Sequence, residues 1–324
     1  MDELMASYDV IVIGGGAAGL NGALMLARSR RAVAVIDSGQ PRNAPADGVH
    51  GLLGHDGLPP LELLERGRNE VRSYGGHVVD GEVSSAARAD DGFTVTLSDG
   101  RTALTRRLLV TTGLVDELPD VPGVKALWGG DVLHCPYCHG WEVRDKAIGI
   151  LATGPRAMHV ALLFRQLSAD ITYLAHGAPP GEDDAEQLAA RGIAVLDSPV
   201  VSLELGNDRL AGVRLADGTT VDLDALVVLP HMVARATFLR DLGLATSEHP
   251  SGLGEHIPVD ATGRTSLPGV WAAGNVTDVA AQVGGAAAAG ALAGAQINAD
   301  LVAEDTAIAV SASRAVPVGG VAVP

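Results

Sequence analysis

The chain has 324 residues, 47% of them hydrophobic, and carries a formal net charge of −16 at pH 7. That length allows two compact domains, each with a buried core. The acidic balance argues against a surface for nucleic acid or for an anionic membrane, because both select for excess lysine and arginine.

The chain begins with the acidic run Met1–Leu4 and passes directly into a strand pattern. Such a start fits neither a signal peptide nor a transit peptide. No apolar run reaches transmembrane length without interruption. We therefore expect a cytoplasmic protein with no membrane partner.

The first predicted unit is a strand over Tyr8–Ile13, a glycine loop and a helix over about Ala17–Arg28. The β-branched run in the strand is typical of a parallel strand buried on both faces. In a dinucleotide-binding turn, one glycine makes the turn, a second admits the pyrophosphate and a third lets the helix pack on the strand. Gly14, Gly16 and Gly19 fill these positions. The sequence therefore predicts a dinucleotide at the helix N-terminus.

A second strand, Ala32–Ile36, is predicted to follow this helix and to end at Asp37. An acidic side chain at that strand end is placed to hold a ribose hydroxyl. The elements follow in the order of a dinucleotide-binding unit: a strand, a glycine loop, a helix, a second strand and an acidic residue at its end. This order favours a bound nucleotide over a glycine-rich turn without a ligand.

Two cysteines, Cys135 and Cys138, follow an apolar strand over Leu108–Gly113, where we expect the chain to leave its first domain. A dithiol at this spacing can close into a disulfide, and the neighbouring sulfur lowers the thiol pKa. In a reducing compartment such a pair suggests catalysis rather than a structural cross-link. A redox dithiol and a dinucleotide in one chain indicate electron transfer between them.

The architecture of the first unit repeats with strands over Ala147–Leu151 and Ile171–Leu174, but its chemistry does not. Ala152 stands at the first glycine position, where a methyl group competes with a tight turn and a phosphate. Pro155 is tolerable in a first helical turn. A site for the 2′-phosphate of NADPH needs a cation after the second strand, and only His176 is available there.

The last third of the chain, from about Leu244, contains a motif over Gly269–Asp278 that ends a strand on a glycine turn. The next segment, Gly284–Gly290, has no bulky side chain. It suits a helix whose N-terminus approaches a flat cofactor, and it equally suits a small-residue packing helix. The end, Ser311–Pro324, shows no clear periodicity and predicts a loose tail.

These motifs together resemble the low-molecular-weight thioredoxin reductase family over nearly the whole chain. The resemblance implies an α/β fold with two Rossmann-like dinucleotide-binding domains, the second inserted into the first. The FAD-binding domain would combine residues 1–116 and 244–324, and the insert, 117–243, would be a degenerate NAD(P)-binding-like domain that carries the dithiol. A homodimer is expected from the family. The implied cofactor-binding residues are Gly14, Gly16, Ala17, Ala18, Gly19, Asp37, Ser38, Gly113, Gly274, Asn275 and Asp278.

The departures from that family fall on nicotinamide binding and proton handling. Gly177 and Ala178 replace the paired arginines that grip NADPH, and His139 replaces the acid after the second cysteine. The run over residues 135–142 looks like that of the dithiol oxidases of gliotoxin, holomycin and romidepsin biosynthesis. Those enzymes close a disulfide in a small molecule and pass the electrons through FAD to O2. The resemblance thus implies an enzyme of antibiotic biosynthesis that needs no NADPH.

The implied mechanism begins with attack of a substrate thiolate on Cys135, the cysteine farther from the flavin in the family. The second substrate thiol resolves the mixed disulfide, Cys138 passes the electrons to FAD, and O2 takes them up with release of H2O2. A base for the substrate thiol aids exchange. Imidazole titrates in the useful range, so His139 is the first candidate and His134 the second. Each also fits a cap or packing role, and His231 is expected to be structural.

Other functions compete with the oxidase. A thioredoxin-disulfide reductase would use NAD(P)H or another donor such as ferredoxin, and Gly154 and Ala157 keep part of a nucleotide loop. A flavoprotein could also use its second domain to bind a partner, although the intact dithiol argues against that. Cys135–His139 matches a covalent haem-attachment signature, but no export signal is present and the flavin elements would lack a purpose. Zinc is disfavoured because no second cysteine pair exists, and no metal is expected.

Overall fold

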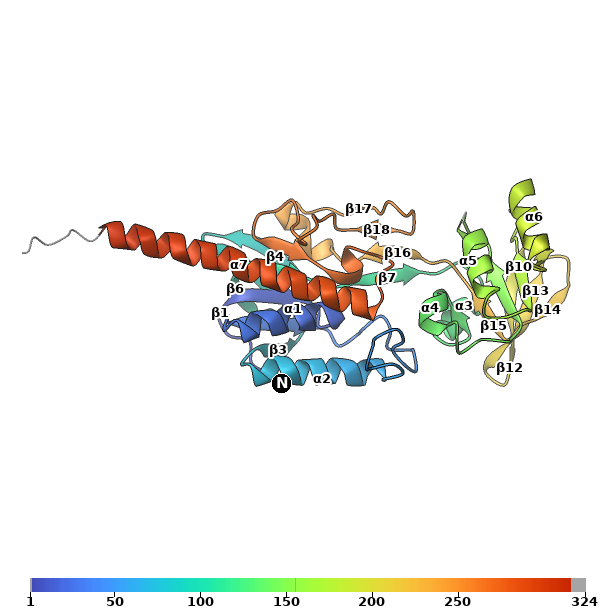
Figure 1. Ribbon diagram of the computed structural model, residues 1–324, viewed down its shortest axis with the longest axis horizontal. Helices are drawn as coiled ribbons and strands as arrows, with labels where there is room; N and C mark the ends of the chain where they lie inside the picture. Colours follow the sequence, from blue (N-terminus) through green and yellow to red (C-terminus); the bar gives the residue numbers. More distant parts are fainter. Residues whose placement is uncertain (1, 155, 316–324) are drawn as a thin grey trace, which may run out of the picture.

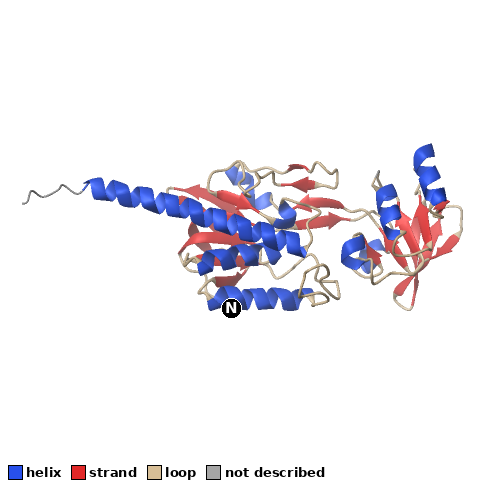
Figure 2. Ribbon diagram, viewed as in Figure 1, coloured by secondary structure: helices blue, strands red, loops and turns tan. Residues whose placement is uncertain are grey.

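The computed structural model describes residues 2–154 and 156–315, which form two parts joined by a narrow ribbon (Figure 1). The larger part contains both ends of the described chain, and the smaller part contains the middle. Each part has helices packed against strands (Figure 2). The prediction of an α/β fold with a second Rossmann-like unit inserted into the first is confirmed.

The larger part is built on a seven-stranded sheet of order β3-β2-β1-β6-β5-β4, with β19 beside β6. β1, β2, β3, β6 and β19 are parallel, whereas β4 and β5 form antiparallel hairpins at one edge. The strands are β1 Ser7–Ile13, β2 Val33–Asp37, β3 His77–Asp80, β4 Val83–Ala89, β5 Gly92–Leu97, β6 Thr102–Val110 and β19 Val270–Ala272.

Strand β1 is buried on both faces, as its β-branched run predicts. Val10 and Val12 face a core shared with helices α1 (Ala17–Arg28), α2 (Pro60–Ser73) and α7 (Val283–Ala315). Ile11 and Ile13 face the opposite core, which contains β4, β5 and the short helix η1 (Thr237–Leu242). The alternation fixes β1 in register between β2 and β6, so that its carboxyl end carries the glycine loop.

Helix α7 packs closely on α1 because small residues meet at the contact. A Cβ at Gly290 would lie 1.9 Å from the carbonyl oxygen of Ala18, and one at Gly294 would lie 2.6 Å from that of Gly22. The prediction of a loose tail is wrong for residues 311–315, which continue α7; the rest of that segment lies outside the described residues. Alanine has the highest helix propensity, and the Ala-rich end of α7 extends beyond the sheet (Figure 1).

The smaller part has a parallel sheet of order β11-β10-β9-β15-β8 and a three-stranded antiparallel sheet, β12-β13-β14. Its helices pack on the parallel sheet (Figure 1). Its elements are α3 Val124–Leu127, β8 Val132–Leu133, α4 Pro136–His139, β9 Ile148–Leu151, α5 Ala157–Phe164, β10 Ile171–Leu174, α6 Glu182–Ala190, β11 Ala194–Leu196, β12 Val200–Gly206, β13 Arg209–Leu215, β14 Thr220–Asp222 and β15 Ala225–Val227.

An antiparallel pair, β7 (Leu114–Glu117) and β16 (His231–Ala234), forms the ribbon that carries the chain out and back. His231 begins β16 with its side chain exposed. After β16, Phe238 and Leu239 pack into a core of the larger part. The division into 1–116 plus 244–324 around 117–243 remains a proposal, and this packing favours a return to the larger part near residue 234. The remaining elements are β17 Ser247–Glu248, β18 Glu255–His256 and η2 Gly274–Val276.

Candidate functional site

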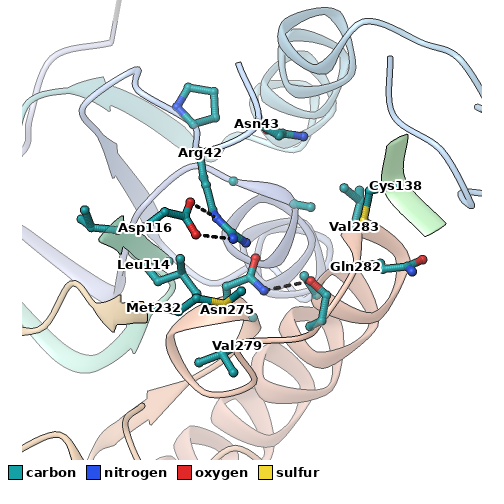
Figure 3. Close-up of a pocket in the computed structure, with 18 of the residues that line it drawn as sticks. Arg42, Asn43, Leu114, Asp116, Cys138, Met232, Asn275, Val279, Gln282 and Val283 are labelled. Atoms are coloured by element: carbon teal, nitrogen blue, oxygen red, sulfur yellow. Dashed lines mark hydrogen bonds and ion pairs between the residues drawn. The ribbon is translucent and has the colours of Figure 1, made fainter. Parts of the chain in front are cut away.

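A cavity of about 910 Å³ lies between the two parts and is lined by both (Figure 3). The larger part contributes the glycine loop, the segment after β2, the ribbon and the start of α7, and the smaller part contributes α4 and α5. Both cysteines and both candidate histidines line it. The predicted cofactor residues that line it are Gly14, Gly16, Ala17, Ala18, Asp37, Ser38, Gly113, Gly274 and Asn275, whereas Gly19 and Asp278 do not.

The glycine loop has the geometry of a cradle for a diphosphate. Gly14 has φ +103°, and a Cβ there would lie 2.5 Å from the carbonyl oxygen of Thr111. Gly16 is the N-cap of α1, faces open space and leaves the first-turn amides without a side-chain cap. The first turn of α1 holds no acidic residue that would repel an anion. Gly19 lies behind the loop, where a Cβ would meet the Gly14 carbonyl oxygen at 1.9 Å.

Asp37 ends β2 beside this loop. Its Oδ1 accepts a hydrogen bond from the Gly15 amide at 3.1 Å, and its Oδ2 accepts one from Arg68 at 3.0 Å. Both interactions fix the carboxylate at the cavity wall, where its remaining lone pairs can accept from a ribose hydroxyl. Arg68, which comes from α2, carries no local sequence signal that would have predicted this contact.

The motif before α7 forms a second wall of the cavity. Gly274 has φ +80°, and the Asn275 amide donates to the carbonyl oxygens of Asp278 at 3.1 Å and Ala281 at 2.8 Å. The Asp278 carboxylate accepts from the Ala280 amide at 3.0 Å, so this side chain holds the turn. These bonds aim the N-terminus of α7, including Val283, into the cavity (Figure 3).

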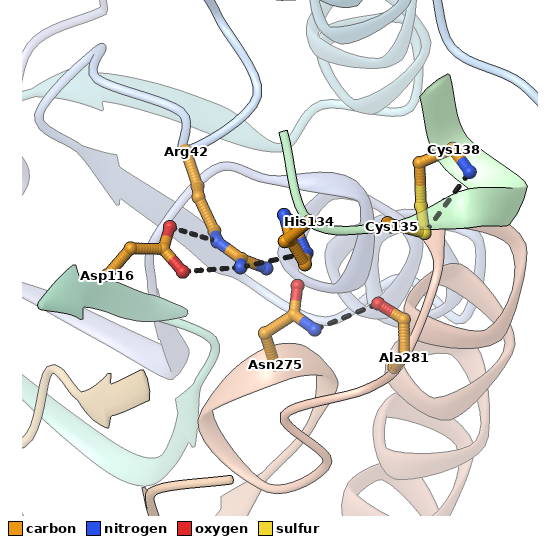
Figure 4. The surroundings of a disulfide bond; sticks show 7 residues. All are labelled: Arg42, Asp116, His134, Cys135, Cys138, Asn275 and Ala281. Atoms are coloured by element: carbon orange, nitrogen blue, oxygen red, sulfur yellow. Dashed lines mark hydrogen bonds and ion pairs between the residues drawn. A yellow bond between two sulfur atoms is a disulfide. The ribbon is translucent and has the colours of Figure 1, made fainter. Parts of the chain in front are cut away.

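Cys135 and Cys138 form a disulfide at the start of α4 (Figure 4). Their Cα atoms are 5.3 Å apart, within the range that a disulfide needs. The Cys138 amide donates to Cys135 Sγ at 3.1 Å, so the first cysteine also caps the helix. Cys135 is half-buried and Cys138 is exposed to the cavity, so both sulfurs can meet a ligand.

His139 ends α4 next to the disulfide. Burial lowers the pKa of His139, against the opposing effect of the Glu142 and Asp47 carboxylates. Glu142 in turn lies 3.4 Å from His50 Nε2 of the larger part. The imidazole is therefore available as a neutral base at neutral pH.

His134 has different surroundings, which sequence analysis did not anticipate. Its ring stacks on Trp128 with centroids 5.4 Å apart, and its Nε2 lies 3.4 Å from Nη2 of Arg42. Arg42 is held in turn by Asp116 (Figures 3 and 4). Burial and the Arg42 charge lower the pKa of His134 to about 4. The two histidines that flank the disulfide thus differ in basicity.

The second nucleotide-type loop departs from the first in its surroundings as well as its sequence. Ala152 is buried, and His176 Nδ1 accepts from the Val200 amide at 3.1 Å, which ties the ring to the backbone. The first turn of α6, which follows β10, carries Glu182, Asp183 and Asp184. Negative charge beside this strand end opposes binding of a 2′-phosphate.

No group of three or more His, Cys, Asp and Glu side chains placed to hold a metal ion occurs among residues 2–154 and 156–315. Within the same described part of the chain, no helix combines the length and apolarity needed to cross a membrane.

Comparison with known proteins connects this site to a family. The family described as pyridine nucleotide-disulphide oxidoreductase matches residues 8–293. The chain is 31% identical to "Thioredoxin reductase sirT" of Leptosphaeria maculans over 93% of this chain and 96% of that protein. It is 32% identical to "Thioredoxin reductase tcpT" of Claviceps purpurea over 91% and 95%.

Solved structures give the same result. The crystal structure of HlmI superposes with a TM-score of 0.89 at 46% identity, covering 97% of this chain and 98% of that one. An oxidoreductase from Agrobacterium tumefaciens superposes with a TM-score of 0.86 at 36% identity, covering 91% and 99%. A disulfide in a shared cavity with a dinucleotide-type loop fits these similarities. The chain belongs to the pyridine nucleotide-disulphide oxidoreductase family and is a thioredoxin reductase-like enzyme of thiol/disulfide exchange.

Proposed function

We propose that this protein is an FAD-dependent dithiol oxidase that closes an intramolecular disulfide in a small natural-product dithiol, with O2 as the final acceptor. The observation that carries the proposal is a contrast between the two nucleotide-type loops. The first opens into the cavity that holds the Cys135–Cys138 disulfide. The second has a buried Ala152, a His176 ring tied to the backbone, and three acidic side chains in the next helix.

The first loop supplies the residues that would hold FAD. The amides at the start of α1 would bind the diphosphate, Asp37 the ribose, and Gly274 and Asn275 the region of the flavin. When bound, FAD would accept two electrons from the reduced dithiol and deliver them to O2, with release of H2O2. Both cysteines line the cavity, and the assignment of Cys138 as the cysteine nearer the flavin rests on the resemblance to the family.

The chain's own residues account for the exchange steps. A substrate thiolate attacks Cys135 Sγ, the S–S bond breaks, and the electron pair leaves on Cys138 Sγ. The second substrate thiolate attacks the substrate sulfur of the mixed disulfide, and Cys135 leaves as a thiolate. The substrate dithiol thereby loses two electrons as its disulfide forms, and the same two electrons reduce the enzyme disulfide to the thiolates of Cys135 and Cys138. His139, neutral at pH 7, is placed to accept a proton from a substrate thiol.

A small-molecule substrate is favoured by the shape of the site. The disulfide lies within the cavity of about 910 Å³ that would also hold FAD, so a substrate must enter the remaining space to reach the sulfurs. The Tyr137 side chain between the cysteines lines the cavity and is 66% exposed, so it offers an aromatic face to a ligand beside the sulfurs.

The alternative is a thioredoxin-disulfide reductase that uses NAD(P)H or another donor. It is favoured by the printed names of the relatives at 31% and 32% identity. Arg156, which lines the cavity at the start of α5, is a cation that a nucleotide could use. The two functions differ in which reactant reduces the flavin.

Anaerobic mixing of the yellow holoenzyme with dithiothreitol, NADPH or NADH distinguishes the two. We expect dithiothreitol alone to bleach the flavin absorbance, and air to restore it with one H2O2 released per dithiol oxidised. Rapid bleaching by either nicotinamide would instead establish the reductase. Replacement of sulfur by oxygen provides the matched variants: Cys135→Ser and Cys138→Ser should each keep the flavin bound yet abolish bleaching by dithiothreitol. Turnover retained in either variant would refute the mechanism.

A cytoplasmic homodimer remains part of this proposal. Ile308 and Val310 near the end of α7 are 62% and 41% exposed, which supports a self-association surface there. Sedimentation velocity of the full chain over a range of concentrations tests it, with a monomer at all concentrations as the refuting result.

A further inference from the structure

One segment of the larger part, residues 42–50 after β2, contacts the smaller part on both sides of the disulfide. Arg42 Nη2 lies 3.4 Å from Nε2 of His134, which directly precedes the first cysteine. His50 Nε2 lies 3.4 Å from Oε1 of Glu142, which follows α4. Both ends of the segment also line the cavity. We call residues 42–50 the clamp segment.

A third contact between the clamp segment and the smaller part is steric. The backbone of Gly129, before β8, packs against Pro45 so closely that a Cβ on Gly129 would lie 2.7 Å from Pro45 Cβ. Gly129 also has φ +86°, which glycine adopts without the steric cost that a side chain brings. The two parts therefore meet here with no room for a side chain between them.

The clamp segment is itself fixed to the larger part. Val49 is 3% exposed, its amide donates to the Leu58 carbonyl oxygen at 2.8 Å, and its own carbonyl oxygen accepts from the Gly57 amide at 2.8 Å. The Ala44 and Ala46 amides close two short turns with hydrogen bonds of 3.0 Å. A segment with buried and paired backbone groups opens less readily than an unpaired loop. Its contacts can therefore hold the smaller part in one position.

Arg42 also holds the ribbon on which the smaller part is carried (Figure 4). Its Nε and Nη2 donate to the two carboxylate oxygens of Asp116 in β7, both at 2.6 Å. The Asp116 side chain is only 6% exposed. Bidentate pairing of this kind fixes direction as well as distance. One arginine of the larger part thus contacts both the ribbon and His134, the residue next to the disulfide.

Resting on the proposed dithiol oxidase, we infer that the clamp segment keeps the disulfide in the cavity that would hold FAD throughout the catalytic cycle. Arg42, Pro45 and His50 are then positioning residues for the transfer of electrons out of the reduced cysteines. The two parts stay together while substrate enters and product leaves. This arrangement favours a small dithiol, which can enter the cavity while the parts remain in contact.

The ribbon alone would not secure this placement. Movement between two parts of a chain is the default expectation unless a large interface holds them. Reaction at a buried site depends steeply on position, and a misplacement of about 1 Å can cost about 100-fold in rate. The clamp segment limits a movement that two strands by themselves would permit.

A wedge at the steric contact provides the first test. Gly129→Ala places a methyl group against Pro45 and should push the smaller part away from the clamp segment. Gly218→Ala is the matched control, because Gly218 lies in the smaller part with φ +89° and a Cβ there meets nothing within 4 Å. It imposes similar backbone strain without a wedge.

The two glycine variants are compared as anaerobic holoenzymes at saturating dithiothreitol, where the bleaching rate no longer depends on attack of the thiol. We expect Gly129→Ala to lower this plateau rate roughly 10- to 100-fold relative to Gly218→Ala. Small-angle X-ray scattering of the oxidised proteins should give a larger radius of gyration for Gly129→Ala than for the control. Equal plateau rates and equal radii in the two variants would overturn the inference.

A cross-link provides the second test. In His50→Cys with Glu142→Cys, dibromoacetone can join the two new thiols by thioether bonds that dithiothreitol does not reduce, and the native cysteines are protected in the oxidised enzyme by their disulfide. We expect the cross-linked holoenzyme to bleach with dithiothreitol and to turn over repeatedly in air, at least as fast as the same variant before cross-linking. Loss of bleaching on cross-linking would show that the parts must separate, and would overturn the inference.

Failure of the proposed function gives a different result. In that case dithiothreitol would not bleach the flavin of the wild-type enzyme. The scattering comparison needs neither substrate nor O2, so it tests the clamp segment whichever reactant reduces the flavin.

Discussion

The contact between α1 and α7 gives a prediction that connects packing to the cofactor site. In Gly290→Ala, the added Cβ would lie 1.9 Å from the Ala18 carbonyl oxygen and 2.6 Å from its carbonyl carbon. The clash is with backbone, which cannot rotate away, so α7 must shift. Overpacking costs typically ~1–3 kcal/mol, more than the ~1 kcal/mol that alanine gains over glycine in a helix. Because Ala18 lines the cavity, the shift should also loosen the diphosphate cradle.

Gly285→Ala is the matched control, because it lies in the same helix and a Cβ there meets nothing within 4 Å. Because the clash is with backbone, we take the upper end of the overpacking range, which leaves a net cost of about 2 kcal/mol after the helix-propensity gain. At ~2–4 °C per kcal/mol in larger domains, the thermal unfolding midpoint of Gly290→Ala should fall by ~4–8 °C. Its flavin should dissociate faster on dilution, followed by fluorescence. The control should match or exceed the wild-type midpoint. Equal midpoints and equal flavin retention in the two variants would refute the packing argument.

Two further predictions concern ionisable groups. Burial lowers the pKa of His139 below its ordinary value near 6.5, so the rate of flavin bleaching by dithiothreitol should rise with pH through a midpoint below that value. The Glu142 carboxylate raises this pKa, so Glu142→Gln should move the midpoint lower still. Stopped-flow pH profiles in which the variant leaves the midpoint unmoved would contradict this reasoning. Asp131 accepts hydrogen bonds from Arg209 and the Leu210 amide, and the Arg209 bond lowers its pKa below 3.8. Its contribution to the free energy of unfolding is therefore present above the unfolded-state pKa and lost as pH falls through the folded-state pKa. Asp131→Ala should cost about 1–3 kcal/mol in urea unfolding at pH 7, a difference that should shrink below pH 3.8.

The sequence was sufficient for those parts of the fold that depend on local patterns. The β-branched run of β1 and the spacing of the three glycines place a strand, a turn and α1, because strand burial and tight turns each restrict the residue type locally. The Cys135–Cys138 disulfide is also local, since three residues separate its partners. The insertion of the second unit came from resemblance rather than from any periodicity.

The sequence was insufficient where the site depends on contacts between distant loops. Arg42 lies 74 residues from Asp116 and 92 residues from His134 in the sequence, and none of the three lies in a motif. An arginine in a polar loop is most often a solvated side chain, and only the ribbon geometry brings Asp116 beneath it. The choice between the two histidines therefore could not be made from residue types alone. The prediction for the end of α7 was wrong for another reason. A helix that packs against nothing need not show hydrophobic periodicity, so no pattern in the sequence indicated it.

The charges around the two nucleotide-type loops bear on the source of the electrons. A dinucleotide brings a diphosphate, and α1 meets it with bare amides and no acidic residue in the first turn. NADPH would bring a further phosphate to the smaller part, where the first turn of α6 carries three carboxylates and His176 is tied to Val200. Restoring a glycine at Ala152 would relieve only the steric obstacle and leave this charge in place. The described residues place one favourable nucleotide site and one disulfide in a single cavity. This arrangement supports our proposal that substrate thiols supply the electrons and that the Cys135–Cys138 disulfide receives them.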